Sequence, residues 1–574
     1  MEPLSSATWA NSVAYYNGRV YTLNEMQEWT EGFIVNETGV FEAVGSSQDI
    51  LAIADKRRLV RFDLRQKFIM PGIHDAHAHM YFAGLAQMSE ATLELEPNDA
   101  KIAEKIQKGH CMCSHTGERH DWILGNSYLP IHFPDNVPDR RYLDEIFPDR
   151  PVLIRELSVH SMLLNTTALE RLNINDATPD PPGGRYVRRA DGTLSGELYE
   201  SAMEKVWNAV PFPPMSHYKR TLSHAVSICH SYGITSAQEA TASTMELHAF
   251  RELEAENRLD FDIYTHIVSA PGSAVGESED SLAAQISIAE GFRTKHIHPH
   301  FIKFILDGVP MAPNFTHAQL DSEGKVDPNL LLVKQDTLLE RIKLYDAKGY
   351  TCKVHAAGEG SARLALDILE QVRALNPNGP RHEVANCNSV HAGEEFLEHN
   401  CTLWILKADC PVSRRYEAIC AIEGDRQMSP AIFHNEDMIK ANPKFFNWDF
   451  VGMHKTGALT TIGSDWVVVP TPNVLPSVAC LAEPIGAGIK TDVDDGLTDL
   501  QRGSRVIIRM LTLGGAEAVD SKRSAGSIEV GKKANFIALD SDLSEGEFAN
   551  ATCLQTWFEG RIVYTARKDR SVAL

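Results

Sequence analysis

The chain has 574 residues, of which 43% are hydrophobic and 23% charged, as in an ordinary globular protein with a large core. Its net charge of −22 argues against nucleic acid or an anionic membrane as a partner, because both bind positive patches. No apolar run reaches the ~18 residues of a membrane span, and the ten cysteines are scattered rather than spaced as a disulfide framework. We therefore expect a cytoplasmic protein that acts on a small molecule, with a homodimer as the assembly to test.

Both ends of the chain contain short apolar segments separated by turn residues, a pattern typical of strands. Asn17-Gly18 predicts a hairpin between the first two of them, and Glu559-Gly560 predicts the last turn. Neither end is long enough to fold alone. The expected strands are residues 13–16, 19–23, 32–36 and 40–45 near the N-terminus, and 534–540, 556–559 and 561–565 near the C-terminus.

Between the two ends, extended runs alternate with helical patterns, which predicts βα units and a parallel sheet. The clearest extended run is 233–239. One segment, about 84–214, breaks the alternation with Pro-rich polar stretches, and we interpret it as an insertion between the first and second strands. The expected helices are residues 216–232, 338–348, 362–375 and 501–513.

The most informative motif follows the Pro71-Gly72 break near the start of this alternating region. His77 and His79 are two positions apart, so in an extended segment both imidazoles point to one side. Two imidazoles at a strand end are half of a site for zinc or a similar metal. In a chain with 23 histidines such a pair also arises by chance, so the motif needs its context.

That context consists of polar residues at or near the ends of other predicted strands. His355 ends an apolar run before a glycine turn, Asp465 follows another run, and Lys303 is the one cation within a β-branched and aromatic run. A charge in such a run is costly unless it is paired or ligated. In a (β/α)₈ barrel, the carboxyl ends of the strands meet at one mouth. We therefore expect these side chains to converge with the two histidines.

On these segments the chain resembles the amidohydrolase superfamily and, within it, amidohydrolase family 3, the branch that includes N-substituted formamide deformylases. The resemblance covers nearly the whole chain. The segments that carry it are Gly18 to Thr22, Pro71 to His79, Val159 to Ser161 with Asn165, Lys303 with Asp307-Gly308, His355 to Gly358, Arg381-His382, Gly463 to Trp466, and Gly526 to Phe536.

The resemblance implies a (β/α)₈ barrel of the TIM type with a small composite β-sandwich domain built from both chain termini. The expected boundaries are 1–66 for the N-terminal part of the sandwich, 67–523 for the barrel with its insertion at about 84–214, and 524–574 for the C-terminal part of the sandwich.

The resemblance also implies a metal site. Its expected ligands are His77, His79, His355 and Asp465, with Lys303 as a further ligand if it is carboxylated to N6-carboxylysine. An unmodified Lys303 paired with a carboxylate such as Asp307 is the alternative. Asp465 is expected to carry the proton from the attacking water to the leaving nitrogen. The remaining expected site residues are His160, a pocket histidine that stabilises the carbonyl oxygen, and Glu200 and Trp466, which bind substrate or belong to the core.

One departure from the family pattern concerns a second metal. Where the sixth strand of the family carries a histidine ligand, this chain has Asn386, and an amide oxygen is a poorer zinc ligand than imidazole. His391 lies five residues further on and could replace it through a shifted loop. We expect one tightly held Zn²⁺ and a second site that is weakened or lost.

These inferences predict a metal-dependent amidohydrolase that cleaves a C–N bond (amide, N-formyl or cyclic amide) of a small molecule by metal-activated water. Two alternatives stay open at this point. One is an aminohydrolase that deaminates a heterocycle with the same ligands. The other is a degenerate barrel with a non-hydrolytic or binding role.

Overall fold

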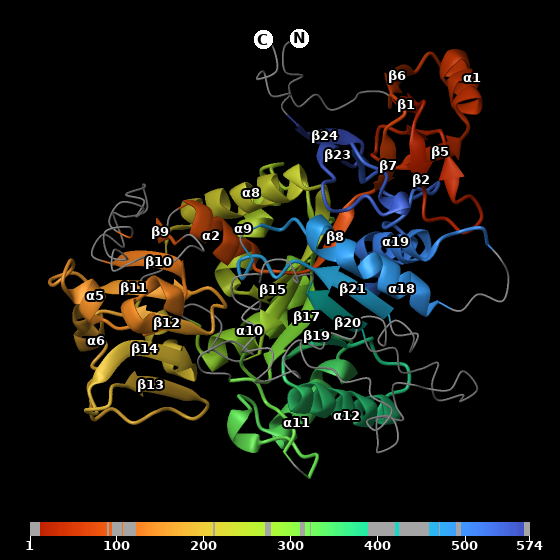
Figure 1. Ribbon diagram of the computed structural model, residues 1–574. Helices are drawn as coiled ribbons and strands as arrows, with labels where there is room; N and C mark the ends of the chain where they lie inside the picture. The colour runs from red at the N-terminus through yellow and green to blue at the C-terminus, as the bar shows by residue number, and fades with distance from the viewer. Residues whose placement is uncertain are drawn as a thin grey trace.

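Eight parallel strands form the central sheet of the computed structural model (Figure 1), in the order β21-β20-β19-β18-β17-β16-β15-β8. A parallel bridge between Ala78 and Trp466 joins the two outer strands, so the sheet closes into the expected (β/α)₈ barrel. The strands are β8 (Ile73–Ala78), β15 (Ile234–Ala242), β16 (Asp262–Val268), β17 (Ile297–Ile305), β18 (Thr351–Ala356), β19 (Glu383–Asn386), β20 (Ile419–Glu423) and β21 (Leu459–Gly463). The structure describes residues 12–88, 91–93, 106, 122–210, 213–269, 277–309, 316–321, 323–387, 419–423, 459–469, 471–489 and 495–566.

Helices alternate with these strands and begin where the sequence provides caps. The side chains of Ser243, Ser278 and Thr498 accept hydrogen bonds from the backbone at the starts of α9, α10 and α19. All four helices expected from the sequence are present, with ends shifted by a few residues. The main helices are α2 (Met80–Met88), α8 (Met215–Ser231), α9 (Thr244–Ala255), α10 (Glu279–Ile288), α11 (Gln335–Ala347), α12 (Glu359–Leu375), α18 (Ala482–Gly488) and α19 (Asp499–Arg509).

Strands from both ends of the chain form the composite sandwich, as expected. One sheet has the order β5-β4-β1-β6 and the other β24-β23-β22-β7-β2-β3. Large aromatic side chains from both ends, such as Tyr15, Phe33, Phe536 and Trp557, pack between the sheets. The strands are β1 (Val13–Tyr16), β2 (Arg19–Tyr21), β3 (Trp29–Thr30), β4 (Gly32–Val35), β5 (Phe41–Gly45), β6 (Val60–Asp63), β7 (Phe68–Pro71), β22 (Phe536–Leu539), β23 (Cys553–Phe558) and β24 (Arg561–Thr565). Because β7 pairs within this domain, its N-terminal part extends beyond residue 66.

The predicted hairpin at Asn17-Gly18 is wrong. Asn17 has the left-handed backbone of a turn residue, with a φ of 60°, but β1 and β2 belong to different sheets. The turn chemistry was recognised correctly, whereas the partner of each strand was not, because burial between the two sheets decides it. At the other end, Glu559 and Gly560 do join the paired strands β23 and β24.

The insertion folds into a mixed six-stranded sheet of its own, at the left of Figure 1, in the order β13-β14-β12-β11-β10-β9. A separate hydrophobic cluster supports this sheet. Its strands β12 and β14 pair so that the residues next to their ends, His160 and Glu200, lie together. The strands are β9 (Ala91–Thr92), β10 (Ile123–Tyr128), β11 (Val152–Glu156), β12 (Ser161–Leu164), β13 (Gly184–Arg188) and β14 (Leu194–Glu200).

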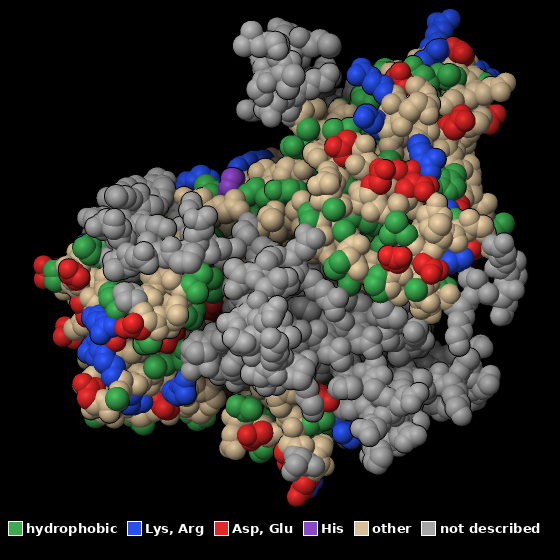
Figure 2. Space-filling view, in the orientation of Figure 1, with side chains coloured by type: hydrophobic (Ala, Val, Ile, Leu, Met, Phe, Trp, Pro, Cys, Tyr) green, Lys and Arg blue, Asp and Glu red, His purple; other side chains and the backbone are tan. Residues whose placement is uncertain are grey.

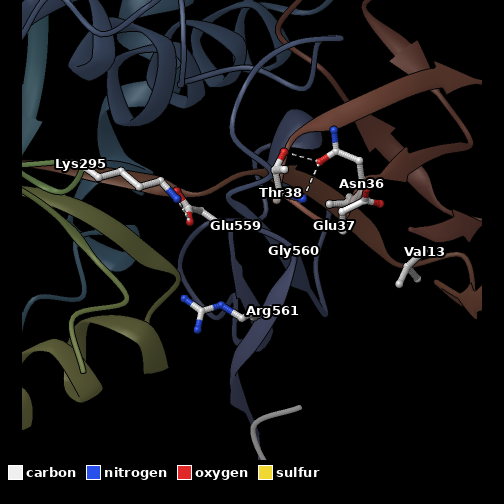
Figure 3. A pocket seen from close by; sticks show the side chains of 10 residues that line it. Val13, Asn36, Glu37, Thr38, Lys295, Glu559, Gly560 and Arg561 are labelled. Atoms are coloured by element: carbon white, nitrogen blue, oxygen red, sulfur yellow. Dashed lines mark hydrogen bonds and ion pairs between the residues drawn. The ribbon is translucent and has the colours of Figure 1, made fainter. Parts of the chain in front are cut away.

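The surface of the sandwich carries both signs of charge: Lys and Arg side chains are interspersed with Asp and Glu on the face shown in Figure 2. A cavity of about 300 Å³ lies where the sandwich meets the barrel (Figure 3), and the ion pair between Lys295 and Glu559 (2.5 Å) crosses its wall. Lys295 precedes β17, so this cavity is at the amino end of the barrel strands. Among the described residues, no helix combines the length and the apolar character needed to cross a membrane.

Candidate metal centre

The seam between the first and last barrel strands brings the key residues together. The amide of Asp465 donates to the carbonyl of His77, and the amide of His79 donates to the carbonyl of Trp466, both at 2.7 Å. Below them, the buried carboxylate of Asp75 accepts hydrogen bonds from the amide (2.9 Å) and the hydroxyl (2.5 Å) of Ser464. The two strands are therefore cross-linked on both sides of the carboxyl end of the seam.

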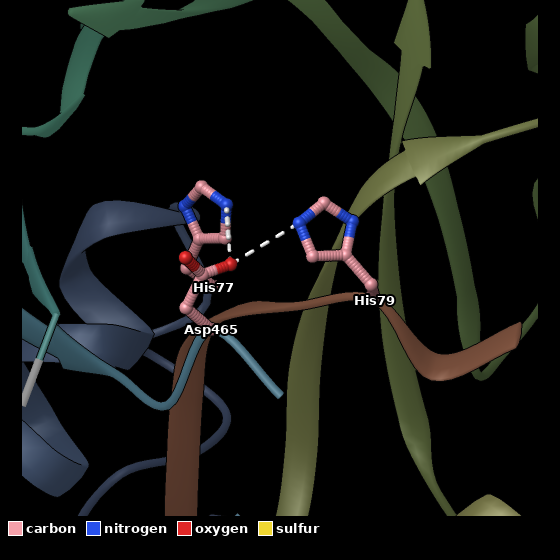
Figure 4. A group of neighbouring side chains, drawn as sticks. All are labelled: His77, His79 and Asp465. Atoms are coloured by element: carbon pink, nitrogen blue, oxygen red, sulfur yellow. Dashed lines mark ion pairs between the residues drawn. The ribbon is translucent and has the colours of Figure 1, made fainter. Parts of the chain in front are cut away.

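His77, His79 and Asp465 form one buried group at this seam (Figure 4). One ligand atom from each lies within 4.8 Å of those of the other two. The Nε2 atoms of His77 and His79 are 3.6 and 3.1 Å from Oδ1 of Asp465. Thr241 holds the His79 ring from the other side, at 2.9 Å from Nδ1. Two imidazoles and a carboxylate at these distances are a ligand set suited to zinc.

The environment favours the protonation states that a metal needs. Burial lowers the pKa of His77 well below its usual value, and the nearby Lys303 lowers it further. Burial also lowers the pKa of His79, although Asp465 opposes this shift. Burial alone would raise the pKa of Asp465, but the hydrogen bond from His79 and the charges around it bring the pKa below its usual value. Neutral imidazoles beside an ionised carboxylate are ready to bind a cation.

Close packing at the seam predicts a strong effect for Gly463→Ala. A Cβ atom at this position would lie 2.5 Å from the amide nitrogen of His77, which is too close for either strand to remain in place. We expect a loss of about 1–3 kcal/mol of stability, as for other overpacked sites, and weaker metal retention. Thermal unfolding and metal analysis measure the two effects. Gly291→Ala is the matched control, because a Cβ there meets nothing within 4 Å; an equal result for both variants would contradict this account.

Lys303 lies inside the barrel next to this group. It is 2% exposed, and its charge affects His77, His79 and Asp465. Its predicted alternative partner, Asp307, instead accepts hydrogen bonds from the backbone of the loop after β18, including the amides of residues 357 and 358 at 2.9 Å. The structure thus places the lysine where a ligand is needed. Its carboxylation stays a prediction.

His355 is buried at the end of β18, but it is not one of the three grouped residues. Its Nε2 lies 3.1 Å from the carbonyl oxygen of Gly308 and 3.7 Å from Oδ1 of Asp307. Its ring faces that of His160, with 5.3 Å between the ring centroids. The structure therefore brings together three of the expected ligands and places the fourth beside them.

His160 reaches the barrel mouth from the insertion and is fixed by Glu200. Its Nδ1 is 2.9 Å from Oε2 of Glu200, whose other oxygen accepts a hydrogen bond from Thr316 (2.8 Å). Burial alone would lower the pKa of His160, but the carboxylate of Glu200, with a smaller contribution from Asp465, raises it above its usual value. The contacts of Glu200 described here are with protein groups. Its predicted substrate-binding role stays a prediction.

The remaining expected residues lie at the edge of what the structure describes. Asn386 is buried at the end of β19 with a left-handed φ of 72°, one position after the residue that pairs with His355. His391 lies outside the described residues. Trp466 is 1% exposed and packs in the main core, so its side chain is a core residue in this structure, and a role in substrate binding stays a prediction.

Sequence reasoning missed a buried charge network below the metal group. Lys353 is paired with Glu383 at 3.0 Å, and both side chains are 0% exposed. The ammonium of Lys353 also donates to Gln238 and to the carbonyl of Ala76, each at 2.6 Å. A usable signal was present: Lys353 stands two positions before His355, so on a strand both point into the barrel.

Comparison with known proteins decides the family. The model of the amidohydrolase family matches residues 61–564. The chain belongs to this family. The N-substituted formamide deformylase of Arthrobacter pascens is 22% identical over 96% of this chain and 97% of its own length.

Solved structures share the fold. A crystal structure of an uncharacterized metal-dependent hydrolase from Pyrococcus horikoshii has a TM-score of 0.67 at 19% identity, covering 94% of this chain and 99% of that chain. A zinc-bound adenosine deaminase from Xanthomonas campestris has a TM-score of 0.52 at 13% identity, covering 96% and 92%. As a member of the amidohydrolase family, the protein is a metal-dependent hydrolase that acts on carbon–nitrogen bonds.

Proposed function

We propose that this amidohydrolase cleaves an amide, N-formyl or cyclic amide bond of a small molecule, with zinc held by His77, His79 and Asp465. The observation that carries the proposal is the convergence of these three buried side chains at the barrel mouth. The name of the Arthrobacter relative supports an N-formyl amide as one substrate class. Lys303, carboxylated, is the further ligand that we propose.

A zinc ion bound here supplies Lewis acidity, which lowers the pKa of water toward ~7 and polarises a carbonyl. The protein groups do the rest. Asp465 accepts the proton of the attacking water and delivers it to the leaving nitrogen, a role that its lowered pKa and its place among the ligands support. Thr241 keeps His79 oriented toward the same point.

A product assay tests the proposed reaction. The metal-loaded protein is incubated with a panel of N-formyl amines, simple amides and cyclic amides, and with aminated heterocycles, and the products are identified. Release of an amine, or ring opening, supports the proposal. Release of ammonia from a heterocycle would replace it with deamination, which the same three ligands permit. No turnover of any substrate by a zinc-loaded protein would favour a binding role.

Metal content gives an independent prediction. We expect the protein isolated from zinc-supplemented growth to contain about one equivalent of transition metal and clearly fewer than two, because one compact ligand group is present. Elemental analysis of the desalted protein measures this. His79→Asn should lose most of the metal. Two firmly held equivalents, or none, would contradict the proposed site.

A further inference from the structure

His160 and His355 form a second histidine pair next to the proposed zinc site. Their ring centroids are 5.3 Å apart, nearly the same as the 5.4 Å between His77 and His79. The His160 side chain is 16% exposed and that of His355 is 5% exposed, so both lie at the mouth with little contact with solvent. The pair comes from two distant parts of the chain, the insertion and the barrel.

Each ring of this pair is held through one nitrogen, which leaves the other for a ligand. The described hydrogen bond of His160 uses Nδ1, which faces the carboxylate of Glu200 at 2.9 Å. That of His355 uses Nε2, which faces the carbonyl of Gly308 at 3.1 Å. A carboxylate or carbonyl behind an imidazole fixes the tautomer in which the opposite nitrogen carries a lone pair, and this is the usual arrangement behind metal-bound histidines.

The backbone around the pair is held in conformations that cost energy. Val159, directly before His160, has a φ of 60°, and Glu200 has a φ of 50° with a ψ of −125°. For a β-branched residue a positive φ is a genuine outlier, and such strain costs about 1–3 kcal/mol per residue and clusters at functional sites. Both strained residues serve to present the His160 ring to the mouth.

We propose that His160 and His355 are the nitrogen ligands of a second, weaker divalent-cation site, adjacent to the first. His160 binds through Nε2 and His355 through Nδ1, and Glu200 is the positioning residue that keeps the His160 lone pair directed at the cation. Asp465 interacts electrostatically with both histidines and links the pair to the first group. This assignment rests on the proposed function only in that the two sites share one mouth.

Zinc titration of the metal-free protein at pH 8, followed by calorimetry and by metal analysis, tests this site. Wild type should show one tight phase and one weaker phase. His160→Asn should remove the weaker phase. Glu200→Gln should weaken it about 10- to 100-fold, as the loss of such a partner does at other metal sites. Both variants should keep the tight phase. Circular dichroism and thermal unfolding first confirm that each variant is folded.

Controls separate this site from the first one and from surface binding. His248→Ala removes an exposed histidine and should change neither phase, whereas Asn386→Ala should also leave the weaker phase in place. His79→Asn should abolish the tight phase, and its failure to do so would count against the proposed function rather than against this pair. An unchanged weaker phase in both His160→Asn and Glu200→Gln, with or without slower turnover, would overturn the inference, as would a wild type with a single phase.

Discussion

Replacement of Asp465 by asparagine is expected to lower turnover by about 10²-fold or more while the fold is retained, because an amide cannot accept the proton of the attacking water. The side chain lies 3.1 Å from His79, so an amide of the same size can occupy its place. His77 and His79 remain to hold the metal. The rate constant at saturating substrate and the metal content of the same preparation together measure the effect.

The matched control is Asp367→Asn, the same chemical change on the outer helix α12, far along the chain from the site. It should leave turnover and metal content at wild-type values. An Asp465→Asn variant that retains metal and a near-normal rate would show that another group carries the proton. A variant that loses both metal and turnover would show that Asp465 acts mainly as a ligand.

Loss of Lys353 should have the largest effect on stability. Lys353→Met leaves Glu383 as an uncompensated carboxylate in the barrel interior, and breaking a fully buried pair costs about 3–5 kcal/mol. Lys295→Met makes the same change in a pair whose lysine is 58% exposed, where the expected cost is at most about 1 kcal/mol. Urea unfolding of the two variants beside wild type compares the costs. Equal shifts would contradict the assigned role of burial.

The destabilisation should also depend on pH. Burial raises the pKa of Glu383, although Lys353 opposes this shift, so removing Lys353 raises the pKa further. Between the unfolded and the folded pKa, the native state then binds a proton that the unfolded state does not bind, and stability falls as pH rises. Lys353→Met should therefore be less destabilised at pH 5 than at pH 8. The double variant Lys353→Met, Glu383→Met should recover much of the loss and show no such dependence.

The fold could be predicted from the sequence to the extent that local patterns and the family resemblance specify it. Alternating extended and helical segments predicted the βα units, and the structure has helices at all four expected places. The His-x-His spacing predicted two imidazoles on one side, and both are at the end of β8. The composite sandwich was expected from the resemblance, since neither end of the chain indicates its partner. The predicted Asn17-Gly18 hairpin failed for the same reason.

The site itself was decided by tertiary structure. The sequence determined which residue types stand at strand ends, because strand periodicity and turn residues are local properties. It did not determine that Asp465 contacts His79 across the seam while His355 faces His160, nor that Glu383 neutralises Lys353. Those pairings join segments far apart in the chain. They depend on closure of the barrel and on how the insertion packs over its mouth, where burial forces each polar group to find a partner.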